Sequence, residues 1–159
     1  MGSFSVCCRR CRKSNHKKED CWKDCQSIGQ LSNAHPSVLI GSKEYVRIGK
    51  GCIICAANII TTNIEIGDFT ILNLACTVGH DTIIGDYASF MPSVNISGEV
   101  IVSECVYVGT GAKIINQLEI GACTIVGAGA VVAKSLPSDC TAVGVPARVI
   151  KRKERTVLS

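Results

Sequence analysis

Aliphatic residues recur at every sixth position through the middle of the chain, with one phenylalanine among them. The residue after these hexapeptide markers is glycine in seven cases, and the residue two positions before a marker is mostly small or β-branched. Neither the 3.6-residue period of a helix nor the simple alternation of a long strand produces this spacing. The fifteen markers are Ile48, Ile54, Ile60, Ile66, Leu72, Val78, Ile84, Phe90, Ile96, Val102, Val108, Ile114, Ile120, Val126 and Val132.

A six-residue unit fits a short strand followed by a corner. The marker and the residue two before it then both point inward, and glycine suits a corner where φ is positive or two backbones approach closely. Three such sides close a triangular coil, and coils stack through parallel strand pairing. Fifteen markers predict an all-β solenoid of about five triangular coils. A β-sandwich is the alternative, but irregular turns separate its strands and leave no strict period.

The period breaks at both ends of the solenoid. Ile40 lies eight residues before Ile48, which predicts a two-residue insertion in a bulged corner at Lys43 and Glu44. After Val132 we expect a loop and then a basic segment that is helical and caps the last coil. The predicted parts are a basic Cys-rich segment over residues 1–34, a β-helix over 35–136, and a C-terminal loop and basic cap over 137–159.

Composition and the lengths of apolar runs indicate the cellular compartment of the protein. Hydrophobic residues make up 47% of the chain and aromatic residues only 4%, so the core must consist of Ile, Val, Ala and Cys. No apolar run reaches the roughly 18 residues that a membrane span needs, and the N-terminal stretch lacks the apolar segment of a secretory signal. We therefore expect a cytoplasmic protein whose eleven cysteines are free thiols.

Charge is divided between the middle and the ends of the chain. Residues 1–25 hold seven Lys or Arg against three Asp or Glu, residues 26–147 hold five against nine, and residues 148–159 hold five against one. This is not the basic stripe of a nucleic-acid-binding protein, so no nucleic-acid partner is expected. A site for a phosphorylated ligand at one end fits the pattern, and so do solvated basic tails.

Three segments resemble a known family of enzymes: NLACTVGHDTIIGDY from Asn73, SGEVIV from Ser97, and VGAGAVVAKSLP with AVGVPARVIKR between Val126 and Arg152. They are similar to the hexapeptide-repeat acetyltransferases that O-acetylate sialic acid or N-acetylate nucleotide-linked amino sugars. The resemblance covers roughly residues 35–152 and implies a left-handed β-helix. It also implies acetyl-coenzyme A as donor, a sugar or nucleotide-sugar acceptor, and homotrimers with active sites between neighbouring subunits.

The resemblance also implies a catalytic site around His80. A histidine in this position is the family's general base, and acyl transfer from a thioester needs a base near neutral pKa to take a proton from the attacking hydroxyl or amine. The adjacent Asp81 matches an acidic residue that raises the basicity of this histidine, Asn73 matches a position near the acceptor or the histidine, and the Gly98 N–H matches an oxyanion donor. Judged without the resemblance, His80 is an ordinary surface histidine on a corner.

A cofactor site follows from the same resemblance. Thr110 and Ala128 match positions along the coenzyme arm, and the terminal basic residues Arg148, Lys151 and Arg152 could meet its phosphates. Ser89 stands where some family members carry a second histidine that contacts the cofactor. Family members usually have an N-terminal α/β domain that binds the acceptor, and about 35 residues before the solenoid are too few for one. We therefore expect the acceptor site to be largely missing from this chain or built differently.

Other functions stay open. An acetyltransferase for a different acceptor such as serine would keep the chemistry, and a catalytically idle β-helix that serves as a scaffold or trimerisation module would lose it. No metal is expected overall, but Cys8, Cys11, Cys21 and Cys25 have a spacing close to that of a zinc ribbon. A disordered basic arm or the remnant of a lost helix explains the same N-terminal segment.

Overall fold

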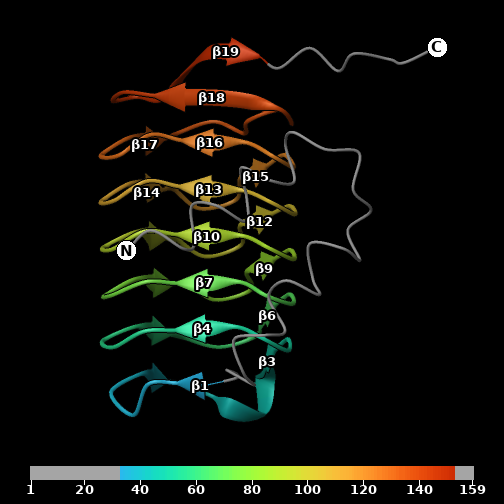
Figure 1. The fold of residues 1–159 in the computed structure, drawn as a ribbon, viewed down its shortest axis with the longest axis vertical. Coiled ribbons are helices and arrows are strands. Elements are labelled where there is room, and N and C mark those ends of the chain that lie inside the picture. The colour runs from blue at the N-terminus through green and yellow to red at the C-terminus, as the bar shows by residue number, and fades with distance from the viewer. Residues whose placement is uncertain (1–32, 153–159) are drawn as a thin grey trace, which may run out of the picture. The chain divides into compact units, whose positions relative to one another are not determined.

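The computed structural model describes residues 33–152, which form a parallel β-helix of about six turns (Figure 1). One 3-10 helix, η1 (Lys43–Tyr45), interrupts these described residues near their start. The strands are β1 (Asn33–Ala34), β2 (Leu39–Ile40), β3 (Val46–Ile48), β4 (Ile53–Ile54), β5 (Ile59–Ile60), β6 (Ile64–Ile66), β7 (Ile71–Leu72), β8 (Thr77–Val78), β9 (Ile83–Ile84), β10 (Ser89–Phe90), β11 (Asn95–Ile96), β12 (Ile101–Val102), β13 (Tyr107–Val108), β14 (Lys113–Ile114), β15 (Glu119–Ile120), β16 (Ile125–Val126), β17 (Val131–Val132), β18 (Cys140–Val143) and β19 (Arg148–Arg152).

Every third strand belongs to the same sheet. Sheet A runs β1-β4-β7-β10-β13-β16-β18-β19, sheet B runs β2-β5-β8-β11-β14-β17, and sheet C runs β3-β6-β9-β12-β15. Through β17, paired strands are parallel and most partners lie eighteen residues apart, as Leu72 and Phe90 do. Figure 1 shows the strands of sheet A stacked one above another. This confirms the predicted left-handed β-helix.

The solenoid has about one turn more than the markers predicted. The coil of β1, β2 and β3 starts before Ile48, outside the regular six-residue count. At the other end, Leu136 pairs with Ile120 in an isolated parallel bridge and completes the sixth coil. The expected insertion at Lys43 and Glu44 is confirmed, because η1 takes up the additional residues at that corner.

The markers form the core. All of them are buried except Ile48, whose side chain is 38% exposed because it lies in the first coil and is covered on one side only among the described residues. The residues two positions before the markers lie beside them in the interior, from Cys52 to Ala130. Phe90, which is fully buried at the centre of the stack, is the largest side chain in this core.

Glycine follows the markers because backbones approach closely there. A Cβ on Gly79 would lie 2.5 Å from the Gly98 nitrogen, and one on Gly109 would lie 2.5 Å from the Ala128 nitrogen. Positive φ occurs two residues later in the corner instead, for example at Asp81 with φ 57°. Asn and Asp tolerate this left-handed conformation better than most residues, so the corners need not be glycine at that position.

Buried hydroxyls and thiols satisfy carbonyls at the corners. Thr70 Oγ1 donates to the Gly85 carbonyl at 3.2 Å, and Cys52 Sγ donates to the Gly67 carbonyl at 3.1 Å. Burial raises the pKa of the Cys52 and Cys76 thiols, so both keep the proton that they donate. Cys52, Cys55, Cys76 and Cys140 are free thiols, as expected from the composition.

The C-terminal cap is a β-hairpin and not a helix. Strand β18 pairs with β16 on one side and antiparallel with β19 on the other, so the basic segment extends sheet A by one strand beyond the last coil. Pairing to β18 supplies the backbone partners that a helix would otherwise provide internally. The predicted helix over this segment is therefore wrong, while the predicted position of the cap above the last coil is confirmed.

The remaining expectations concern metal binding and membrane spans. The proposed zinc ligands Cys8, Cys11, Cys21 and Cys25 lie outside the described residues. Within residues 33–152, no three His, Cys, Asp or Glu side chains are placed to hold a metal ion. This part of the chain also contains no helix that is long and apolar enough to cross a membrane.

The buried stack predicts how the protein responds to loss of Phe90. Replacing it with alanine removes a fully buried ring from a closely packed interior, and the free energy of unfolding should fall by about 3–5 kcal/mol. Urea denaturation followed by circular dichroism measures the change. Leu39→Ala is the control, because Leu39 is 65% exposed and its loss should change the free energy by less than about 0.5 kcal/mol. Equal effects of the two variants would contradict this account of the core.

Candidate active site

The corner that joins sheet B to sheet C, here called the B–C corner, carries His80 in the third coil. Strand β8 ends at Val78, and Gly79 lets the chain turn against the next coil without a side chain in the way. Asp81 then takes the left-handed conformation that closes the corner. Because both side chains leave the corner away from the core, His80 is 57% exposed and Asp81 is 48% exposed.

His80 and Asp81 form a directed pair. The His80 Nδ1 lies 2.7 Å from Asp81 Oδ2, and the Asn63 side-chain amide donates to the other carboxylate oxygen, Oδ1. The hydrogen bond from Asn63, followed by that from His80, lowers the pKa of Asp81 below its usual value. An ionised carboxylate can only accept, so Nδ1 carries the proton of the neutral imidazole and Nε2 is left with its lone pair.

The free nitrogen of His80 faces Gly98 in the next coil. A Cβ built on Gly98 would lie 2.6 Å from His80 Nε2 and 2.7 Å from Cε1, so only glycine leaves room for this ring position. Gly98 itself is buried. No residue among 33–152 accepts a hydrogen bond from the Gly98 N–H. His80 is therefore packed against a residue whose backbone N–H is unused among the described residues.

Sequence reasoning missed Asn63. It lies eighteen residues before Asp81, at the equivalent corner position of the preceding coil, and it also has positive φ. The same column continues upward, where Gln117 Nε2 donates to Glu99 Oε2 at 3.1 Å. The eighteen-residue spacing of the coil was the signal that could have identified Asn63 as the partner of Asp81.

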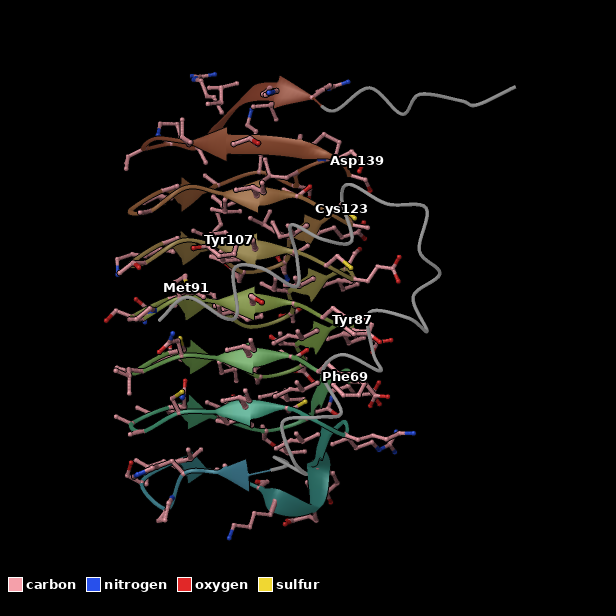
Figure 2. All side chains as sticks on the ribbon, viewed as in Figure 1. Phe69, Tyr87, Met91, Tyr107, Cys123 and Asp139 are labelled. Atoms are coloured by element: carbon pink, nitrogen blue, oxygen red, sulfur yellow. The ribbon has the colours of Figure 1, made fainter. Side chains whose placement is uncertain are left out.

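Asn73 lies at a different corner from His80. It follows β7, at the corner that joins sheet A to sheet B, here called the A–B corner, and its Oδ1 accepts a hydrogen bond from the Leu74 N–H at 2.8 Å. Met91, eighteen residues further on, is labelled at this edge of the solenoid in Figure 2. Within one chain, a side of the triangle therefore separates Asn73 from His80, and the two are not brought together.

Thr110 and Ala128 lie at the A–B corner too, in the fifth and sixth coils. Both are exposed, and the carbonyl of Thr110 accepts a hydrogen bond from the Gly129 N–H at 2.8 Å. A Cβ on Gly111 or on Gly129 would meet nothing within 4 Å. This upper part of the corner thus exposes backbone beside open space, where an extended ligand can approach closely.

The remaining predicted cofactor residues are distributed over sheet A. Ser89 is half-buried in β10, and the basic residues lie on the exposed strand β19. Arg148 pairs with Val143 beside the hairpin turn, and Val143 packs where a side chain on Gly127 of the A–B corner would be. Lys151 and Arg152 lie towards the other end of the strand. Only Arg148 is therefore next to the upper A–B corner.

The third corner joins sheet C to sheet A and carries none of the predicted site residues. Figure 2 labels Phe69, Tyr87, Cys123 and Asp139 along this edge. The rings of Phe69 and Tyr87 stack with centroids 5.4 Å apart and an interplanar angle of 14°. The predicted site residues thus lie at the two ends of sheet B and on strands β10 and β19 of sheet A.

Several solved structures are similar to this chain over more than four fifths of its length. PerB, a perosamine N-acetyltransferase from Caulobacter crescentus crystallised with CoA and GDP-perosamine, is 36% identical with a TM-score of 0.76, over 84% of this chain and 64% of that one. WeeI from Acinetobacter baumannii has the same identity, TM-score and coverage. The acetyltransferase domain of PglB from Neisseria gonorrhoeae, in complex with acetyl coenzyme A, is 28% identical with a TM-score of 0.74, over 83% of this chain and 64% of that one.

These likenesses confirm the resemblance to hexapeptide-repeat sugar acetyltransferases. This chain spans less than two thirds of the length of each of the three structures. No protein-family model and no curated protein matches the sequence.

The Asn63 contact predicts a change in the pKa of Asp81. Because the folded-state pKa lies below the ordinary value, this pairing stabilises the fold at neutral pH and is lost as the pH falls through the folded-state pKa. Asn63→Ala should raise the Asp81 pKa, so that this loss begins at a higher pH. Carboxyl ¹³C NMR titration measures the value directly. Gln117→Ala, which removes the equivalent amide two coils away, should leave it unchanged, and a shift in both variants or in neither would contradict the assignment.

Proposed function

We propose that this protein transfers the acetyl group of acetyl-coenzyme A to a hydroxyl or amine of a sugar or nucleotide-sugar, with His80 as the general base. The observation that carries the proposal is the arrangement at the B–C corner. The lone pair of His80 Nε2 and the unbonded N–H of Gly98 lie together, and Asp81 accepts the proton at the opposite nitrogen of the ring. This combination of base, orienting carboxylate and oxyanion donor is what acyl transfer requires.

Each group then has one role in the reaction. His80 Nε2 takes the proton of the acceptor hydroxyl or amine as that atom attacks the thioester carbonyl carbon. Asp81 stabilises the resulting imidazolium through Nδ1, as the carboxylate of a catalytic triad does. The Gly98 N–H donates to the carbonyl oxygen, which gains negative charge. When the carbon–sulfur bond breaks, the imidazolium returns its proton to the departing thiolate, so the enzyme is regenerated unchanged.

The A–B corner fits the acyl donor. Thr110 and Ala128 are exposed and their neighbouring glycines border open space, so a long apolar arm can lie against the backbone there. Arg148 is next to this corner and supplies a guanidinium suited to phosphate. Lys151 and Arg152 extend the positive charge along β19, and Ser89 adds a hydroxyl on sheet A. Acetyl-coenzyme A supplies the activated acyl group, and PerB and the PglB domain bind CoA or acetyl coenzyme A.

A homotrimer would complete the site. His80 lies at one end of sheet B, whereas Asn73, Thr110 and Ala128 lie at the other end, so one chain presents the two halves of the site on different corners. If the B–C corner of one copy meets the A–B corner of the next, the halves come together. Such a contact is heterologous, and three copies of a triangular prism close it into a ring. Asn73 would then approach His80 of a neighbouring copy.

The similar structures support the proposed acceptor class. PerB was crystallised with a nucleotide-linked amino sugar, which supports an acceptor of this kind. The free thiols of Cys52, Cys55, Cys76 and Cys140 support action in a reducing, cytoplasmic compartment. Transfer to serine or a simple sugar would keep the same base and donor, and an idle scaffold would not turn over at all.

Acetyl transfer by the full-length chain tests the proposal. Acetyl-coenzyme A is mixed with a pool of nucleotide-linked amino sugars, sialic acid, simple sugars and serine, and mass spectrometry identifies any product that gains one acetyl group. His80→Ala should reduce the rate by about 100- to 10,000-fold, since it removes the general base. His35→Ala is the matched control, because the imidazole of His35 bonds only to Ser37 among the described residues. Full activity of His80→Ala would overturn the base assignment, and no product with wild type would overturn the proposed function.

Binding of coenzyme A tests the role of the cap. Arg148→Gln should weaken binding of CoA about 3- to 10-fold, because it removes one charge-assisted phosphate contact, and the loss should shrink as salt is raised. Isothermal titration calorimetry of the two proteins gives the dissociation constants. Arg47→Gln removes another exposed charge, which pairs with Glu65 on sheet C, and it should bind CoA like the wild type. Equal weakening in both variants would mean that Arg148 has no specific role.

A further inference from the structure

We propose that Thr82 is a positioning residue that holds the Ser97–Gly98 peptide so that its N–H faces the reacting groups beside His80. This inference rests on the proposed acetyl transfer, and it concerns a side chain that lies inside the coil and touches no substrate. Thr82 follows Asp81 directly, and its side chain points into the core with no solvent exposure.

The Thr82 hydroxyl lies between both halves of the candidate site. Its Oγ1 is 3.4 Å from the His80 carbonyl and 3.3 Å from the Ser97 carbonyl, so one proton is shared between the two. The His80 carbonyl also accepts a hydrogen bond from the Glu99 N–H at 2.8 Å. Among residues 33–152, only Thr82 donates to the Ser97 carbonyl. The hydroxyl is therefore the main polar anchor of that peptide.

Anchoring the carbonyl determines the direction of the N–H. A trans peptide is planar, and its C=O and N–H point in opposite directions. Since the Ser97 carbonyl points inward to Thr82, the Gly98 N–H points outward, where no described residue accepts it. A hydrogen bond to the carbonyl also polarises the peptide and strengthens its N–H as a donor. Thr82 thus both aims and strengthens the proposed oxyanion donor.

The position of this threonine is specific to the coil that carries His80. The residues two positions before the sheet C markers, just after the B–C corner, are Val46, Ile64, Thr82, Val100 and Leu118. Only Thr82 among them has a hydrogen-bond donor in its side chain. At the corner between sheets C and A, Thr70 makes the same kind of bond to the Gly85 carbonyl at 3.2 Å, away from any candidate chemistry. Thr70 is therefore a matched control for the structural part of the role.

Three variants of the full-length chain separate positioning from stability. Thr82→Val keeps the shape of the side chain and removes its hydroxyl, so kcat for acetyl transfer should fall about tenfold, which is less than the 100-fold or greater cost of losing an oxyanion donor outright. The KM for acetyl-coenzyme A should stay unchanged. Thr82→Ser restores the hydroxyl and should recover most of kcat. Thr70→Val should lower the melting temperature about as much as Thr82→Val and leave kcat within twofold of wild type. Equal values of kcat in the two valine variants would overturn the proposal.

A readout independent of activity follows the peptide itself. In ¹⁵N-labelled protein, Thr82→Val should displace the Gly98 amide resonance and Thr70→Val should not, because only Thr82 bonds the carbonyl of that peptide. An unmoved Gly98 resonance would overturn the proposal even if kcat fell. If wild type makes no product with any acceptor, the proposed function fails and the catalytic consequence fails with it. The amide resonance then still decides whether Thr82 holds the Ser97–Gly98 peptide.

Discussion

Parallel pairing between coils, with partners eighteen residues apart, is the constraint on which the rest of this structure depends. It arranges side chains in columns, so each residue is constrained mainly by those one coil before and one coil after it. His80 faces Gly98, and Asn63 reaches Asp81, because each pair is separated by one coil. A reactive side chain fits on such a scaffold only where the residues one coil away in the same column leave space for it. Gly98, in the coil after His80, is as necessary to the site as the imidazole itself.

Solvent exposure weakens the electrostatic interactions at the candidate site of a single chain. The His80–Asp81 pair is about half exposed, and interactions between charges are weak where water surrounds them. In the proposed trimer, the corner of a second copy would cover this pair and remove water from it. The inner face of the same corner differs, because it is already shielded from water. Solvent therefore does not compete for the hydrogen bonds of the Thr82 hydroxyl there. The outer face of this corner would thus be shielded from water only in the proposed trimer, whereas its inner face is already buried within one chain.

Much of the fold could be predicted from the sequence because a strict period leaves few alternatives. Markers such as Val78 and Phe90 are buried as expected, and the extra residues near Lys43 form the predicted bulged corner. The cap could not be predicted in the same way. Arg148–Arg152 has no hydrophobic period, and its strand conformation depends on pairing with β18, which no local pattern of residues reveals. The glycines that follow the markers were explained only in part, since close approach and not positive φ requires them.

The candidate site shows the same division. His80, Asp81 and Gly98 could be named from the resemblance, and the structure brings these three together. Asn63 was missed because it lies one coil before Asp81 and outside the His80 motif. Thr82 lies within that motif but was missed because its side chain points into the core. Both act through a neighbouring coil or through the interior, so finding them requires the register. Asn73 and Thr110 lie on another corner of the same chain, which a linear motif does not reveal.

The number of coils fixes the distance between His80 and the basic strand β19 along the axis of the solenoid. His80 belongs to the third coil, at the level of β7, and the basic strand β19 lies five strand spacings further along sheet A. The distance between them along the solenoid axis is therefore roughly 24 Å at about 4.8 Å per step. A donor molecule in the proposed reaction must span that length to place its acyl carbon at one end and its phosphates at the other. Adding or removing eighteen residues between these levels would change the measured length by one step and leave both ends chemically intact. Donor length would then be selected by the number of coils rather than by any single side chain.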